Sequence, residues 1–366
     1  MQTRIPCVLM RGGTSRGPYF LASDLPSDPE TRDAVLLAAM GSPHQLQVDG
    51  IGGANPLTSK VAIVSPSAEP GVDVDYLFAQ VAIDKGVVDT RPNCGNMLAG
   101  VGPFAIEAGL VPVQGRETLV RIRNRNTGAL VEAVVQTPNG AVTYEGDAAI
   151  PGVNGTAAPI QLRFREVAGA KTGKLFPTGH RTETIDGVAV TLIDCAMPVM
   201  LLRAADVGAD ANATPAAIDG DKALLARLEA LRLEAGRRMG FGDVTDSVVP
   251  KVTLIGPAPA GSGAALAARY LTPHTTHKSL AVTGGIAIAT AARVPGTVAE
   301  GIALRQPGPV LIAHPSGVLD IALELNGEED VAWAGVLRTA RRIFEGNLLI
   351  PSRIWAGKQA LRAAAE

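Results

Sequence analysis

An internal repeat constrains the fold of this chain more than any single segment does. The first half contains PYFLASDLP from Pro18 and TSKVAIVSP from Thr58, and the second contains PVMLLRAADVG from Pro198 and VPKVTLIGP from Val249. Each half then has a polar segment that leads into a small-residue helix, PNCGNMLAGVGPFAIEAGLV in one and THKSLAVTGGIAIATAARVPG in the other. Because the order is the same, we expect two domains related by duplication, residues 1–184 and 185–366. The last residues could pack back on the first domain.

Short strand-like segments outnumber helical ones. Strands are indicated by β-branched or alternating segments bounded by turn residues: KVAIV, DYLFAQVAI, TLVRIRN, LVEAVVQT, GVAVTLIDCAMPVMLL and KVTLIG. Helices are predicted at Pro29–Met40, Met97–Ala108, Ala213–Met239 and Thr283–Ala292. The fold class is therefore β-rich α+β.

Composition narrows the class of partner. Of 366 residues, 19% are charged and the formal net charge is -2, with no basic stripe for nucleic acid or for anionic membranes. The N-terminal segment has no secretory pattern, and the longest uncharged apolar stretch, Leu280–Ala292, is too short to span a bilayer. Cys7, Cys94 and Cys195 match neither a metal-binding spacing nor a disulfide framework. We expect a cytoplasmic protein with free thiols that binds a small molecule.

Cys94 is the first candidate for chemistry. It stands in PNCGN, just before a predicted helix, where free backbone N–H groups and the helix dipole favour a thiolate. Such a thiol can exchange protons at carbon. Taken alone, Cys94 is equally well explained as a small buried residue at a turn.

Lys60 supports the chemical interpretation of Cys94. It follows DGIGGANPLTS, a loop whose glycines let the backbone come close to a ligand, and Lys251 has the same place in the second repeat. A lysine there can hold a carboxylate or act as a base. The alternative is a surface lysine whose charged end reaches solvent. Since a cleft between similar domains is a common ligand site, we expect Lys60 and Cys94 to share one.

The segment MRGGTSRGPYF is a third candidate. Arg11, Thr14 and Ser15 are predicted on a glycine-rich turn after the first strand, where guanidinium, hydroxyl and N–H groups suit a carboxylate. No Walker or GxGxxG pattern is present, so a nucleotide cofactor is not predicted.

In the second repeat, TPHTTHKSLAVTG occupies the position of the Cys94 segment. His277 and Lys278 are therefore candidate ligand-binding residues, whereas a metal held by His274 and His277 is poorly supported, because no carboxylate or thiol is close in sequence. GHRTETIDG, with His180 and Glu183, is typical of a solvated hairpin.

These motifs resemble a known family. PNCGN at a helix start in a duplicated β-rich chain is similar to the diaminopimelate epimerase fold, in which two domains each wrap a sheet around a central helix. LMRGGTSRGPYFLASDLP, DGIGGANPLTSKVAIV, NCGNMLAGVGPFAIEAGLV and THKSLAVTG resemble more closely the branch of methylaconitate cis-trans isomerase and 4-oxalomesaconate tautomerase, from Arg4 to about Gly357. Two departures stand out: the second helix start has His277, Lys278 and Ser279 where epimerases have a cysteine, and Arg16 replaces a more usual lysine.

The resemblance implies a cofactor-independent isomerase with its active site in the cleft between the domains. Its substrate would be a di- or tricarboxylate, most simply 4-oxalomesaconate from aromatic acid degradation, and the protein could be a homodimer. Lys60 and Cys94 would be the proton acceptor and donor, in an order that the sequence does not give. The carboxylates and the enolate oxygen would be held by Arg11, Thr14, Ser15, Asn96, His277, Lys278 and Ser279. No cofactor and no metal are implied.

Three alternatives stay open from the sequence. Allylic or cis-trans isomerisation of oxalomesaconate or methylaconitate would use the same residues. An amino-acid epimerase would need a base on each face of a stereocentre and a site for an ammonium group, which the cationic candidates do not favour. A non-catalytic polycarboxylate-binding protein would need the cations but not the thiol.

Overall fold

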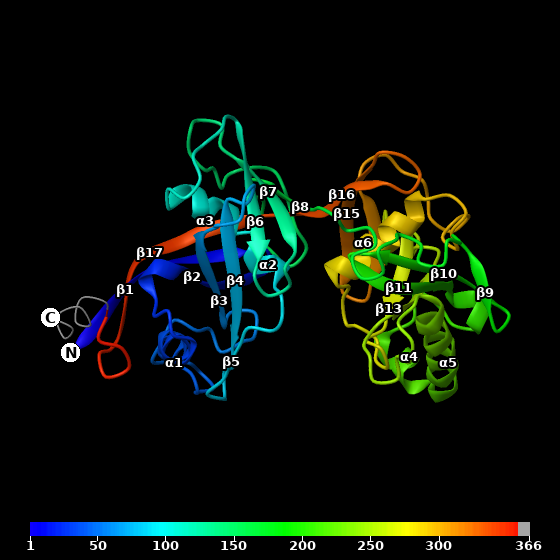
Figure 1. Ribbon diagram of the computed structural model, residues 1–366, viewed down its shortest axis with the longest axis horizontal. Helices are drawn as coiled ribbons and strands as arrows, with labels where there is room; N and C mark the ends of the chain where they lie inside the picture. The colour runs from blue at the N-terminus through cyan, green and yellow to red at the C-terminus, as the bar shows by residue number, and fades with distance from the viewer. Residues whose placement is uncertain (358–366) are drawn as a thin grey trace. The chain divides into compact units, whose positions relative to one another are not determined.

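The computed structural model describes residues 1–357 and divides the chain into two compact units (Figure 1). Unit 1 comprises Met1–Arg163 together with residues 337–357, and unit 2 comprises Phe164–Val336. The division falls at Arg163 and Phe164 rather than at residue 184, and the last segment belongs to unit 1. Two strands, β8 (Ile160–Phe164) and β16 (Val331–Arg338), carry the chain from one unit to the other.

Unit 1 is built on a mixed sheet. In it, β1 pairs antiparallel both with β2, the next strand in sequence, and with β17, near the other end of the chain. Next, β2 pairs parallel with β3, β3 antiparallel with β4, β4 parallel with β6, and β6 antiparallel with β7. The short β5 pairs with the end of β4. The strands are β1 (Gln2–Gly12), β2 (Ser15–Leu21), β3 (Lys60–Pro66), β4 (Val74–Val81), β5 (Val88–Asp89), β6 (Glu117–Asn124), β7 (Leu130–Gln136) and β17 (Ala340–Pro351).

The two faces of this sheet have different partners, because side chains alternate along each strand. In β3, Val61 and Ile63 join the apolar cluster that includes residues of α1 (Pro29–Met40). Lys60 has the opposite parity, so it points to the other face, where α2 (Gly95–Leu98) and α3 (Val101–Glu107) lie. Small residues allow this close packing: a Cβ on Gly102 would come within 2.8 Å of Val135 Cγ2.

Unit 2 repeats the plan. Strands β10 to β13 follow the pairing pattern of the first unit, with α6 (Val282–Arg293) as its central helix and α4 (Pro215–Gly220) and α5 (Lys222–Arg238) on the opposite face. Gly284 and Gly285 lie against Tyr270 and Leu319 with no room for a Cβ. The strands are β9 (Glu183–Ile185), β10 (Val188–Cys195), β11 (Met197–Arg203), β12 (Lys251–Gly256), β13 (Leu266–Tyr270), β14 (Val310–His314) and β15 (Gly317–Leu325).

Strand pairing confirms the repeat. In unit 1, a parallel pair (β2 and β3) is followed by an antiparallel partner, with Lys60 opposite Gln80. In unit 2, β11 and β12 form the parallel pair, with Lys251 opposite Val199, and β13 is the antiparallel partner. The α+β class and the arrangement of a sheet around a central helix in each half are therefore confirmed.

Several predicted elements differ in detail. Pro29–Met40 is confirmed as α1, whereas the helix predicted from Ala213 is two helices, because Asp221 caps α5 by accepting a hydrogen bond from Leu224 N. The single strand predicted over residues 187–202 is a hairpin of β10 and β11 that turns at Ala196, whose φ is 60°. No helix within residues 1–357 is long and apolar enough to cross a membrane.

Candidate active site

Cys94 lies immediately before α2. Its backbone is extended (φ -136°, ψ 98°), its side chain makes no capping hydrogen bond, and 8% of the residue is exposed. The Tyr76 hydroxyl donates to the Cys94 carbonyl oxygen at 3.3 Å and so holds the turn. A Cβ on Gly95 would meet no atom within 4 Å. The thiol is thus held beside backbone that faces open space.

Lys60 begins β3, as the sequence predicted. Its Nζ donates to Gln80 Oε1 at 2.7 Å and lies 5.0 Å from the centroid of the Phe78 ring. Both partners come from β4, which pairs antiparallel with β3. The position of the lysine nitrogen is therefore fixed by the neighbouring strand.

Gly17 on β2 is where the lysine strand and the cysteine helix meet. A Cβ there would come within 1.8 Å of Lys60 O and 3.1 Å of Met97 Cε. Met97 is the third residue of α2, whose first turn follows Cys94. Because only hydrogen fits at Gly17, the backbone of Lys60 and the helix that follows Cys94 pack on the same residue.

The hairpin between β1 and β2 adjoins the same helix. Its two-residue turn, Gly13 and Thr14, lies against Asn96: Nδ2 of Asn96 donates to Thr14 Oγ1 at 2.9 Å. A Cβ on Gly13, whose φ is +52°, would lie 2.2 Å from Asn96 Oδ1. The structure thus brings Thr14 and Asn96 together. The turn is shorter than the sequence predicted, because Arg11 belongs to β1 and Ser15 to β2.

Arg11 and Ser15 flank this turn. Arg11 Nη1 donates to Gly13 O at 2.9 Å and to the carbonyl and hydroxyl oxygens of Thr339 at 3.1 and 3.0 Å. Burial and the positive charge of Arg341 lower the pKa of Arg11, which indicates a locally positive environment. Ser15 is 1% exposed, and its Oγ has no hydrogen-bond partner among residues 1–357. These features suit an anion.

Two tyrosines beside Cys94 were not predicted. Tyr19 and Tyr76 are fully buried, and burial, with a further contribution from Cys94, raises the pKa of both phenols well above 10. Tyr19 donates its hydroxyl hydrogen to Met97 O. In the sequence they are ordinary aromatic strand residues, so nothing in the local pattern distinguishes them from core.

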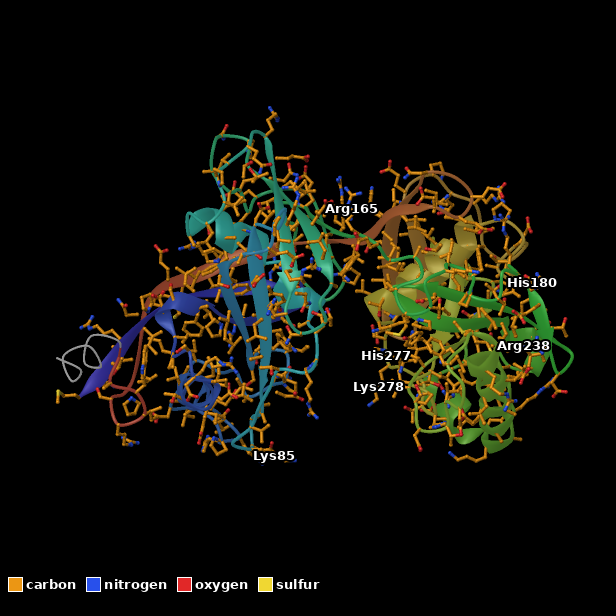
Figure 2. All side chains as sticks on the ribbon, in the orientation of Figure 1. Lys85, Arg165, His180, Arg238, His277 and Lys278 are labelled. Atoms are coloured by element: carbon orange, nitrogen blue, oxygen red, sulfur yellow. The ribbon has the colours of Figure 1, made fainter. Side chains whose placement is uncertain are left out.

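In unit 2, the predicted residues lie on the loop before α6 (Figure 2). His277 N donates to Tyr270 O at 2.8 Å, and His277 Nδ1 accepts from Ser279 N at 3.0 Å, which leaves Nε2 as the ring nitrogen that can face a ligand. Lys278 is exposed, and its carbonyl accepts from Ser316 Oγ. His277 and Ser279 therefore form one short polar turn.

Other candidates lie apart from these. Lys251 is 9% exposed, and burial, with a contribution from Arg232, lowers its pKa. Glu183 begins β9 of the predicted hairpin and accepts from Arg238, whereas His180 is exposed in the loop before β9. In the described part of the chain, no three His, Cys, Asp or Glu side chains group as metal ligands; His274 Nδ1 lies 3.7 Å from a Glu229 oxygen.

Comparison with known proteins supports the resemblance found in the sequence. The family model described as PrpF protein matches residues 2–351. The (4E)-oxalomesaconate Delta-isomerase of Novosphingobium sp. (strain KA1) is 49% identical over 348 residues, covering 94% of this chain and 97% of that protein. The 4-oxalomesaconate tautomerase of Pseudomonas putida (strain KT2440) is 48% identical over 361 residues, covering 98% and 99%.

A solved structure of a similar protein agrees with the fold. The crystal structure of methylitaconate-delta-isomerase superposes with a TM-score of 0.86 at 38% identity, covering 96% of this chain and 97% of that one. The identities and the coverage extend over both units, so the whole chain and not one half of it is matched. This chain belongs to the PrpF protein family of isomerases.

Proposed function

We propose that this isomerase moves a proton within an unsaturated keto tricarboxylate and that its reaction is the keto–enol tautomerisation of 4-oxalomesaconate. The observation that supports the proposal is that the Lys60 backbone and α2, which begins just after Cys94, both pack on Gly17. An amine and a thiol are the two kinds of proton carrier that such a reaction needs. The names of the relatives at 48 and 49% identity supply the substrate class.

The chemistry needs one acceptor, one donor and stabilisation of an anion. One of Lys60 and Cys94 removes a proton from the C–H next to the carbonyl, and the electron pair of that bond delocalises into a dienolate. The other residue returns a proton to oxygen or to a different carbon, and the tautomer or double bond shifts with no net gain or loss of atoms. The proposal assigns the two roles to the pair and does not say which residue is the acceptor.

The substrate carboxylates need cations and N–H or O–H donors. Arg11, Thr14, Ser15 and Asn96 provide them around the hairpin of unit 1, where Ser15 Oγ has no partner within the described residues. His277, Lys278 and Ser279 provide a second set on the loop before α6. Bidentate guanidinium and backbone N–H contacts are well matched to carboxylates. The cleft expected between the halves stays a prediction.

Allylic isomerisation is the second candidate. It is favoured by the near-equal identity of this chain to the relative named a Delta-isomerase and to the one named a tautomerase. Both reactions pass through the same dienolate and differ only in where the proton returns.

The test is to follow the purified protein with 4-oxalomesaconate by ultraviolet absorbance and by proton NMR in deuterated water. We expect turnover with deuterium at the carbon that gains a proton, because an ionised side chain exchanges with solvent between turnovers; the NMR spectrum separates the two products. A metal chelator should leave the rate unchanged. No turnover of 4-oxalomesaconate, methylaconitate or methylitaconate would contradict the proposal, and inhibition by the chelator that a divalent ion reverses would restore His274 and His277 as metal ligands.

The proposal also includes a cytoplasmic homodimer. All three cysteines are free thiols, as a reducing compartment requires. Light scattering of the purified protein measures its mass directly, and a monomeric mass would exclude the dimer.

A further inference from the structure

Gln80 is the hydrogen-bond partner of the Lys60 side chain. It lies directly opposite Lys60 in the antiparallel pair of β3 and β4, and its Oε1 accepts from Lys60 Nζ at 2.7 Å. An ammonium group has three N–H donors, and within the described residues Gln80 accepts the one that is engaged. The Phe78 ring, 5.0 Å away, covers another side of the nitrogen. No other hydrogen-bond partner of Nζ is found among residues 1–357, so its other N–H groups can serve a substrate.

The orientation of the Gln80 amide is fixed by the backbone. Its Nε2 donates to Ser59 O at 2.8 Å and to Pro56 O at 3.2 Å. Both N–H groups are used by carbonyl oxygens, so Oε1 has to face Lys60; a flipped amide would place an oxygen against those two carbonyls. The bond to Lys60 is therefore built into the loop before β3.

That loop is itself supported from behind. Ser59 is fully buried, donates through Oγ to Val81 O at 2.8 Å and accepts from Gln47 Nε2 at 2.8 Å. Gln47 Oε1 in turn accepts from Ala54 N at 2.9 Å. Each polar group in this chain of contacts has its partner, which makes the position of Gln80 rigid.

We propose that Gln80 is a positioning residue that aims the Lys60 nitrogen and, as a neutral acceptor, leaves its proton free to transfer. This inference rests on the proposed function, because it assumes that Lys60 transfers a proton. A carboxylate here would hold the ammonium form by charge and would set its second oxygen against the carbonyls of Ser59 and Pro56. The amide supplies the hydrogen bond to Lys60 without a countercharge and donates to both carbonyls. Because the amide is neutral, the positive charge of Lys60 remains available to pair with the anionic substrate.

The first arm of the test measures the protonation of Lys60 without using activity. Full-length Gln80→Glu, Gln80→Met and parent proteins are labelled with limiting acetic anhydride over a range of pH, and the Lys60 peptide is quantified by mass spectrometry. Only the neutral amine reacts, so a carboxylate at position 80 should reduce labelling near pH 8 by roughly tenfold, and Gln80→Met should not reduce it. Gln114→Glu, which adds the same charge on an exposed loop, should match the parent.

The second arm measures kcat and KM against pH. In either role of Lys60, the part of the pH profile that depends on it should move to higher pH in Gln80→Glu, because more base is then needed to deprotonate the ammonium. Gln80→Met should lower kcat by about tenfold or more with KM within about threefold, since the amine is misaligned while the carboxylate contacts remain. Labelling and pH profiles equal to those of the parent in both variants would overturn the inference.

The two proposals fail in distinguishable ways. If the parent protein turns over none of the three substrates, the proposed function is wrong; if Lys60→Ala keeps full turnover, only the proton-transfer role of Lys60 is wrong. In both cases the labelling arm still reports whether Gln80 controls the lysine. If Lys60→Ala is inactive and both Gln80 variants are parent-like, only the inference about Gln80 is wrong. Should Gln80→Glu fail to fold, as judged by circular dichroism, Gln80→Met decides alone: full kcat at every pH overturns the inference.

Discussion

Gly95 directly follows Cys94, and we expect the substrate to bind in the open space beside Gly95. A Cβ at this position would meet no atom within 4 Å, and its φ is not in the left-handed region. Backbone that close to Cys94 and free of side chains can approach a ligand. No packing contact in the described residues therefore requires a glycine here.

We expect Gly95→Ala to fold normally and to bind substrate poorly. Alanine is favoured over glycine in a helix by up to about 1 kcal/mol, so the midpoint of thermal unfolding should not fall. The new methyl group would occupy ligand space and raise KM by roughly tenfold or more. Gly86→Ala, at another open glycine, is the control, and it should leave KM unchanged. An unchanged KM in Gly95→Ala would place the substrate elsewhere.

Cys195 is a thiol of the opposite kind. It is fully buried in β10, bonded to Thr290 Oγ1 at 3.4 Å, and burial raises its pKa to about 12. Its environment is that of a structural core residue, in contrast to Cys94 beside open backbone.

Alkylation with iodoacetamide at about pH 8 should therefore modify Cys94 before Cys195, because only a thiolate reacts. The ordinary value for the thiol is 9.0, below that in the folded protein, so stability linked to Cys195 is fully present below about pH 9 and is lost as pH rises toward 12. Mass spectrometry of the native protein checks the order of labelling. Equal rates at Cys94 and Cys195 would contradict this assignment.

At the scale of elements, Gly17 of β2 is the residue on which both β3, at Lys60, and α2, at Met97, pack. The Cβ that Gly17 lacks would lie 1.8 Å from Lys60 O, a distance that no side-chain rotation relieves, because the contact is with backbone. A side chain at Gly17 would therefore require the backbones of β2 and β3 to shift.

Gly17→Ala should destabilise the protein by about 1–3 kcal/mol or more, since the strands must move apart. It should also reduce turnover, because the same movement shifts Lys60 relative to α2. Urea unfolding and kcat measure the two effects, with Gly86→Ala as the reference. A variant with parent stability and rate would show that the packing on Gly17 is not what holds the two residues in place.

How much could be predicted from sequence also depends on the element. Residue pattern and flanking turn residues were enough for α1 and β12, and the glycine-rich motifs identified the hairpin of Thr14 and the start of β3. The turn at Ala196 was missed because an alanine with positive φ carries no turn signal, and β14 to β17 were not assigned. Gln80 was missed because its role comes from pairing opposite Lys60, a relation that only the register of two strands creates.

At the scale of the whole molecule, duplication gave two similar units with different polar groups. Unit 1 has an amine and a thiol beside its central helix, whereas unit 2 has Lys251 on the matching strand and His277 before α6. Its cysteine, Cys195, lies at the end of β10 and not at the helix start. This asymmetry favours the proposed reaction of one thiol and one amine over a symmetric two-thiol reaction.

The central claim is that Lys60 and Cys94 act as one proton-transfer pair, and the most direct test is the turnover of Lys60→Ala, Cys94→Ala and the double variant with 4-oxalomesaconate. Each single change should lower kcat by roughly 100-fold or more, and the double variant should be little worse than the poorer single, because residues that act as a unit are not additive. Affinity for a polycarboxylate inhibitor should stay near the parent value in Cys94→Ala and weaken by at most about 1–3 kcal/mol in Lys60→Ala. Losses that multiply in the double variant would contradict the account, since one of the two residues would then only bind.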